Sequence, residues 1–191
     1  MGLTDVLFGR KKLKAPAAER LFALTTAAVT LETELGLKTA GAGAVVFKGL
    51  SAGDFTRAES DIQQLLEAVA ADCGAKLERR DDSYGFTWII VRDPDLEDQV
   101  AAVHTVASEL AAQGFGEQLL AAVFRFDGAD AKRPVYWIYG YKRGAFWPFV
   151  PVGDDKKRDN AKELELKAKL EGELPIEQDV STWFGLYDAP I

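Results

Sequence analysis

Residues 132–151 read KRPVYWIYGYKRGAFWPFVP, and they hold two of the four tryptophans of the chain. Aromatic and β-branched side chains suit a pleated, half-buried surface, so residues 135–141 are predicted to form a strand. Pro134 has no backbone N–H and fits the first position of that strand. Two prolines interrupt residues 146–151. We therefore expect this part to be an extended segment over the core, and not a central strand.

The pattern on the N-terminal side of this stretch predicts an α+β domain. Apolar spacing predicts strands and helices in alternation, at residues 44–48 (strand), 54–72 (helix), 76–80 (strand), 86–91 (strand), 95–112 (helix) and 119–126 (strand). With the aromatic strand added, the order is βαββαβ followed by one more strand. This order is that of the ferredoxin-like split βαβ motif with an extra strand.

The predicted fold is thus a mixed or mainly antiparallel sheet of about five strands, with the helices on one face. A close rival is the antiparallel sheet-and-helix arrangement of type III secretion chaperone-like domains. Helical extensions are expected on both sides of the sheet. Pro16 fits the first turn of an N-terminal helix, and Gly36 fits the end of a second helical run.

The composition changes after Val152, where a charged helix over 160–170 is expected. An apolar tail follows, which we expect to dock onto the body or onto a partner, and it holds Ile176, Val180, Trp183, Phe184 and Leu186. The domain prediction is a basic and apolar segment at 1–14 and a single α+β domain at 15–191. The charged helix and the apolar tail of that domain begin at about residue 153.

The composition sets limits on the function. Thirty acidic residues against 23 basic ones give a formal charge of −7, which weighs against nonspecific nucleic-acid binding. The single cysteine permits no intrachain disulfide, and no secretory signal or membrane-spanning run is expected. A cytoplasmic location is therefore predicted.

The first 14 residues differ in charge from the rest. They combine an apolar group with a basic run, and the residues are Leu3, Val6, Leu7 and Phe8, followed by Arg10, Lys11, Lys12 and Lys14. A helix this short would be marginal alone in water and would need a partner or a bilayer surface. The alternative is a frayed terminus with solvated charges. These eight residues are candidate contacts to a partner or a membrane.

No residue pattern predicts a catalytic, cofactor or metal site. His104 is the only histidine and lies beside an apolar helical stripe, without a serine or thiol motif, so a structural role is expected. Cys73 follows a predicted helix, where the helix dipole disfavours a thiolate. With one histidine and one cysteine, a structural zinc site within one chain is nearly excluded.

Two acid pairs superficially resemble metal ligands. Asp81 with Asp82 and Asp93 with Asp95 both stand where the pattern predicts a turn or a helix start, and turn and capping roles are expected for them.

Lys142 and Arg143 follow the ring-rich strand. Such a pair could neutralise a nucleic-acid strand stacked on the aromatic side chains. The acidic composition favours instead a core role for the aromatics, with both cations in solvent at the strand end. They are the second group of candidate partner or membrane contacts.

Several strings together resemble a known family. They are 7–10 (LFGR), 21–24 (LFAL), 28–32 (AVTLE), 82–88 (DSYGFTW), 113–116 (QGFG), 141–144 (YKRG) and 158–160 (RDN), and they span nearly the whole chain. The chain resembles the phage-shock-protein-A-associated proteins of the B type, PspAB. The resemblance implies a bacterial cytoplasmic accessory of the phage-shock system, which guards the inner membrane under envelope stress. It implies no catalytic residues.

Two functional hypotheses follow. The first is a non-enzymatic interaction protein that binds a phage-shock protein or the inner-membrane surface through its basic N-terminus and its aromatic hairpin. The second is an enzyme with an unrecognised pocket centred on His104, Tyr84 and Arg143. The absence of paired acids, a metal cluster or a nucleophile motif favours the first.

Overall fold

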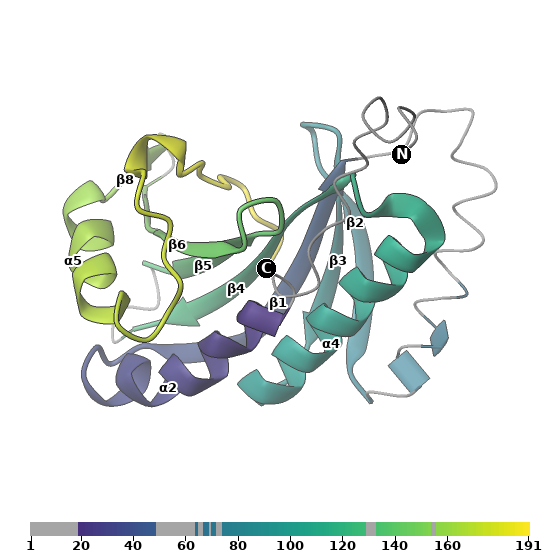
Figure 1. Ribbon diagram of the computed structural model, residues 1–191, viewed down its shortest axis with the longest axis horizontal. Helices are drawn as coiled ribbons and strands as arrows, with labels where there is room; N and C mark the ends of the chain where they lie inside the picture. The colour runs from purple at the N-terminus through teal and green to yellow at the C-terminus, as the bar shows by residue number, and fades with distance from the viewer. Residues whose placement is uncertain are drawn as a thin grey trace, which may run out of the picture.

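The computed structural model describes residues 19–48, 64, 67–68, 70–71, 74–128, 133–153 and 156–191. Its centre is a six-stranded sheet in which every neighbouring pair is antiparallel. The strands follow the order β2-β3-β1-β4-β5-β6 (Figure 1), and they are β1 (Lys38–Lys48), β2 (Lys76–Asp81), β3 (Phe86–Arg92), β4 (Leu119–Asp127), β5 (Val135–Gly140) and β6 (Ala145–Phe149). A short two-stranded sheet joins β7 (Pro151–Val152) to β8 (Lys157–Arg158).

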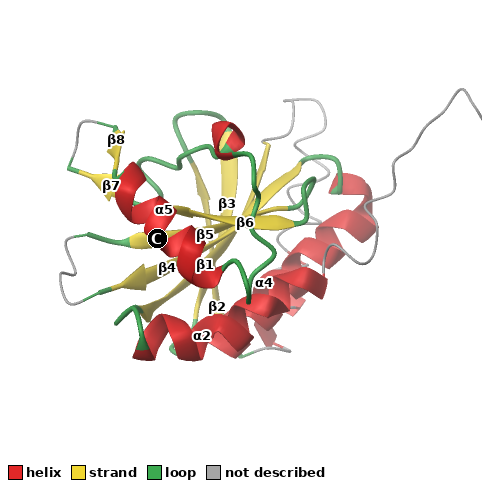
Figure 2. Ribbon diagram, turned by 60° about the vertical axis from the view of Figure 1, so that its left-hand side comes forward, coloured by secondary structure: helices red, strands yellow, loops and turns green. Residues whose placement is uncertain are grey.

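The described helices lie in two places around the sheet. The 3-10 turn η1 (Arg20–Phe22) leads into α2 (Ala23–Thr33), and α4 (Leu96–Leu110) continues into the π-helical turn η2 (Ala111–Phe115). Figures 1 and 2 show α2 and α4 next to each other along one face of the sheet. Helix α5 (Asn160–Leu170) lies apart from them beside β6, and the 3-10 turn η3 (Val180–Thr182) follows it in the chain.

The α+β prediction is confirmed, with helices before and after an antiparallel sheet. The first four strands have the spatial order β2-β3-β1-β4, with antiparallel neighbours. The predicted helix at 54–72 falls mostly outside the described residues. For that reason the complete ferredoxin-like arrangement and its type III secretion chaperone-like rival stay predictions.

The sheet has six strands, one more than the predicted runs, because residues 145–149 pair with β5 as an edge strand. Pro148 lies opposite Trp137 in this pairing. Two positions earlier, the backbone N–H and C=O of Phe146 both point to the outer edge, away from β5. Backbone groups alternate sides along a strand, so the missing N–H of Pro148 also belongs to the outer edge, where a proline costs no bond between strands.

The outer edge of β6 is covered by the C-terminal part of the chain. Phe146 donates its N–H to Pro175 O at 2.8 Å and accepts from the N–H of Glu177 at 2.9 Å. Further along, Val150 accepts from the N–H of Asp159 at 2.8 Å. The segment predicted to dock onto the body or onto a partner therefore docks onto the body, and Ile176 and Trp183 of that segment are buried.

Aromatic side chains fill both faces of the sheet next to this edge. All six residues of β5 are buried. On one face Tyr139 packs against Phe146, with ring centroids 4.8 Å apart. On the other face Tyr136 stacks on Phe149, with centroids 6.0 Å apart. A close approach on this second face requires glycine at position 140, where a Cβ atom would lie 2.8 Å from Cζ3 of the buried Trp147.

This contact predicts that Gly140→Ala destabilises the fold. The indole of Trp147 is fully buried and cannot move aside cheaply, so we expect the free energy of unfolding to fall by about 1–3 kcal/mol in urea denaturation. Gly172→Ala is the matched control, because nothing lies within 4 Å of a Cβ atom at that position. Equal stability of the two variants would contradict the packing of Trp147 on Gly140.

Candidate functional site

The ten candidate contact residues divide into two groups. The eight from the N-terminal segment (Leu3, Val6, Leu7, Phe8, Arg10, Lys11, Lys12 and Lys14) lie outside the described residues. Lys142 and Arg143 are exposed at the tip of the turn between β5 and β6. Gly144 closes this turn with a positive φ of 65° and donates its N–H to Gly140 O at 2.8 Å.

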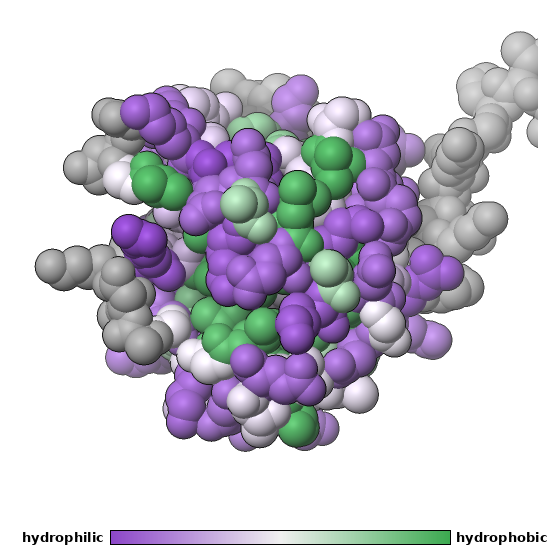
Figure 3. All heavy atoms as spheres, turned by 90° about the vertical axis from the view of Figure 1, so that its left-hand side faces the viewer, coloured by the Kyte–Doolittle hydropathy of each residue, from purple (hydrophilic) through white to green (hydrophobic). Residues whose placement is uncertain are grey.

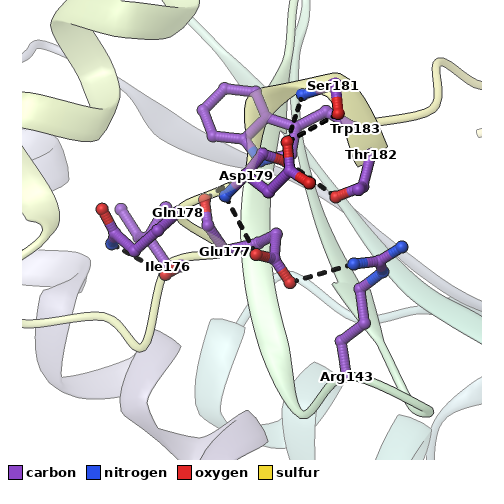
Figure 4. A network of polar contacts seen from close by, with 8 residues as sticks. All are labelled: Arg143, Ile176, Glu177, Gln178, Asp179, Ser181, Thr182 and Trp183. Atoms are coloured by element: carbon purple, nitrogen blue, oxygen red, sulfur yellow. Dashed lines mark hydrogen bonds and ion pairs between the residues drawn. The ribbon is translucent and has the colours of Figure 1, made fainter.

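Arg143 binds within its own chain (Figure 4). Its Nη1 donates to Oε2 of Glu177 at 3.2 Å. The other oxygen of Glu177 accepts from the N–H of Asp179 at 3.0 Å, and Asp179 in turn caps the turn η3 by accepting from Ser181. An ion pair this exposed contributes only about 0–1 kcal/mol. Arg143 thus joins the turn to the C-terminal segment by a weak contact, and Lys142 beside it is exposed to solvent.

The same network determines the charge state of Glu177. The N–H of Asp179 is the main cause that holds the pKa of Glu177 below its ordinary value, burial opposes it, and Arg143 lowers the pKa further. Glu177 therefore stays ionised near neutral pH, and the ion pair with Arg143 persists there.

The residues of the enzymatic hypothesis have three different partners. The ring of His104 on α4 packs against that of Phe22, with centroids 5.1 Å apart. Burial lowers the pKa of His104, and Glu19 offsets part of this shift. Tyr84, in the turn between β2 and β3, hydrogen-bonds through its hydroxyl to Lys156, whose ammonium lies 5.0 Å from the ring centroid.

Tyr84 and Arg143 are also far apart. Both turns lie at the same end of the sheet, but four strand spacings separate them. At about 4.8 Å per spacing, the distance is about 19 Å. Tyr84 and Arg143 therefore do not converge on one site.

Asp82, Asp93 and Asp95 have the predicted turn and capping roles, whereas Asp81 ends β2 and accepts from the hydroxyl of Thr87 at 2.6 Å. Asp82 accepts from the N–H groups of Tyr84 and Phe86 and from the indole of Trp88, at 2.8, 2.9 and 2.9 Å. Burial would raise the pKa of Asp82, but these hydrogen bonds outweigh it and lower the pKa. Asp95 caps α4 by accepting from the N–H of Glu97 at 2.7 Å. Within the described ranges, no three His, Cys, Asp or Glu side chains cluster as metal ligands would.

Sequence reasoning missed a buried carboxylate. Glu163 on α5 is 2% exposed and accepts from the N–H of Val150 at 2.9 Å. Both of its oxygens accept from Nε of Arg158, at 3.0 and 2.9 Å. A signal was present in the sequence, because Glu163 shares a helical face with Leu166 and Leu170, which are buried.

Arg158 connects this carboxylate to the rest of the C-terminal segment. Its Nη1 donates to Trp183 O at 2.8 Å, and its guanidinium lies 5.3 Å from the ring centroid of Phe149. The indole of Trp147 donates to Phe184 O at 3.0 Å. Backbone groups, a buried ion pair and the indole of Trp147 thus hold this segment on β6.

The surface around these contacts is polar. The α5 side of the molecule in Figure 3 is mostly hydrophilic, with apolar side chains in separate groups. Val180 and Phe184 of the C-terminal segment are 50% and 42% exposed. Such a surface suits protein contacts through charges and hydrogen bonds around small apolar points. In the part of the chain that the structure describes, no helix has the length and apolar character to cross a bilayer.

Comparison with known proteins gave one match. The family model described as PspAB, PspA associated protein B, matches residues 1–191. Neither the comparison with curated proteins nor that with solved structures found a match.

The position of Glu163 predicts unequal effects of two substitutions. Glu163→Ala leaves the Val150 N–H without an acceptor in a buried place, and we expect it to lower the free energy of unfolding by about 1–3 kcal/mol. Glu163→Gln keeps an acceptor there and should cost less.

The pH dependence of the Gln variant checks the charge state. Burial raises the pKa of Glu163 above 4.5, while Val150 and Arg158 offset only part of this shift. The folded protein then binds the proton more tightly than the unfolded chain, so wild-type stability falls as pH rises through the raised pKa. In urea denaturation, the free energy of unfolding of Glu163→Gln should therefore increase relative to that of wild type between about pH 4 and about pH 7. A relative loss over this range would contradict the assignment.

Proposed function

The chain belongs to the PspA-associated protein B family, and from this membership we propose that it is a non-enzymatic accessory of the phage-shock system that binds PspA directly. The observation that carries the proposal is the family match over residues 1–191. A match of this extent covers the terminal segments as well as the sheet. In this proposal the protein acts in the cytoplasm as part of the envelope stress response.

The described surface supports a binding role. Lys142 is exposed at the tip of a turn that the hydrogen bond from the Gly144 N–H to Gly140 O closes. A charge in a fixed position at the rim of an interface increases the association rate and the specificity of binding. The separation of Tyr84 from Arg143 supports this role over an enzyme centred on those residues.

A second candidate function is peripheral attachment to the inner membrane. The specific observation is the sequence of residues 1–14, where four cations and an apolar group precede an acidic protein. Each basic residue near an anionic bilayer contributes about 1 kcal/mol, and a small apolar group alone holds only weakly. Attachment through this segment would bring the protein to the membrane without changing how it binds PspA.

Co-purification tests the proposed function. Tagged full-length protein, expressed with PspA of the same host, should retain PspA on the affinity resin. Lys142→Glu should weaken retention about tenfold at low salt, because it reverses a rim charge. Lys169→Glu on α5 is the matched control, since Lys169 is also exposed and the charge change is the same.

A variant that lacks residues 1–14 separates the two candidates. If it retains PspA but no longer sediments with anionic vesicles, this segment serves the membrane. If the full-length protein retains no PspA under any of these conditions, the proposed function is wrong.

A further inference from the structure

Strand β2 carries three charged side chains on the sheet face that points away from α4. A Cβ atom at Gly43 would lie 3.3 Å from Val103 of α4, so the odd-numbered positions of β1 face this helix. Gly43 pairs with Val91 of β3, and Val91 pairs with Leu77 of β2, so these three residues share the face toward α4. Side chains alternate along a strand, so Lys76, Glu78 and Arg80 lie on the opposite face.

The pairing of β2 with β3 places two cations directly opposite each other. Lys76 pairs with Arg92, so their side chains lie on the same face of neighbouring strands. Like charges in this position destabilise a sheet, whereas most cross-strand pairs stabilise it. The fold therefore keeps two cations side by side at its edge.

The carboxylate of Glu78 contacts the guanidinium groups of both arginines in this cluster. Arg80 contacts Glu78 at 3.2 Å, and Arg92 contacts its other oxygen at 3.9 Å. The four side chains of this edge cluster (Lys76, Glu78, Arg80 and Arg92) carry three positive charges and one negative charge, in a chain of net charge −7. The side chains of Arg80 and Arg92 are 54% and 36% exposed, so both can reach a ligand in solvent.

The edge cluster has a rigid base. Trp88 lies opposite Arg80 and Ile90 lies opposite Glu78, and both are buried in the sheet. Trp88 is fixed further by the hydrogen bond from its indole to Asp82 at 2.9 Å. The strand backbone that carries the guanidinium groups is therefore held in place, and the planar geometry of a guanidinium matches a carboxylate with two parallel hydrogen bonds.

We propose that the edge cluster binds an acidic, extended segment of a partner protein. Lys76 and Arg80 are four residues apart on one strand, which is about 13 Å. An extended chain with two carboxylates four residues apart has the same spacing and can meet both ends of the cluster. A narrow acidic segment contacts only the cations, whereas a broad anionic lipid surface would also face the acidic remainder of the chain. The inference rests on the proposed function and assigns to it a surface on the opposite edge of the sheet from β6.

Lys76→Glu tests the edge cluster without a loss of fold. The substitution replaces a like-charge pair with an opposite-charge pair, so the melting temperature should stay equal or rise. Affinity for purified PspA should nevertheless fall about tenfold at about 50 mM salt, and the difference should shrink at about 300 mM. Lys169→Glu, with the same charge change on α5, should bind as wild type does.

An oligo-glutamate peptide provides a probe that is independent of PspA. In NMR titrations of the full chain, it should shift the backbone amides of residues 76–80 and 92, and Lys76→Glu/Arg80→Glu should abolish these shifts. If PspA binds wild type and Lys76→Glu equally, or if the peptide shifts no amide of the cluster, the inference is wrong while the proposed function stands. Loss of anionic-vesicle binding in this double variant, with peptide binding intact, would also overturn it in favour of a lipid surface.

Discussion

The closure of the β6 edge is the constraint on which the rest of the structure depends. Phe146 exchanges hydrogen bonds with the backbone of residues 175–177, and Val150 binds the buried carboxylate of Glu163. An open edge would leave these backbone groups ready to pair with other chains. Because Arg158 joins the same carboxylate to Trp183 O, the C-terminal segment is part of the sheet and not a detachable arm.

The two edges of the sheet consequently offer different surfaces to a partner. At β6 the outer edge is already occupied by the chain itself, and the adjacent turn extends Lys142 into solvent. At β2 the exposed face carries three cations around one carboxylate. Charges on edge strands commonly prevent unwanted pairing. A single charge would prevent such pairing, so the like-charge pair of Lys76 and Arg92 is not needed for it. An acidic partner would reduce the repulsion between these two cations.

The local parts of the fold could be predicted from the sequence, because runs such as 86–91 and 135–141 are long, β-branched and aromatic. Residues 146–151 were expected to form an extended segment and not a central strand, and the pairing of 145–149 with β5 as an edge strand was missed, because the direction of the Pro148 nitrogen depends on a pairing partner that a sequence does not show. The start of β1 at Lys38 was also missed, since a bulge carries the strand past Gly41 and Gly43.

The candidate site was predictable only in part, for the same reason. Exposure of Lys142 follows from its place in a turn, but the partner of Arg143 lies 34 residues further along the chain. The burial of Glu163 depends on the packing of α5 against β6, and the pairing of Lys76 with Arg92 depends on the register of two strands. Each is a long-range contact between residues whose own sequence neighbourhoods are ordinary charged segments.

Hydrogen exchange of backbone amides tests the closure of the β6 edge most directly. If the C-terminal segment is part of the sheet, the amides of Phe146 and Val150 should be protected as strongly as those in the centre of β5. Fast exchange at these two amides, with β5 still protected, would show an open edge and contradict the account.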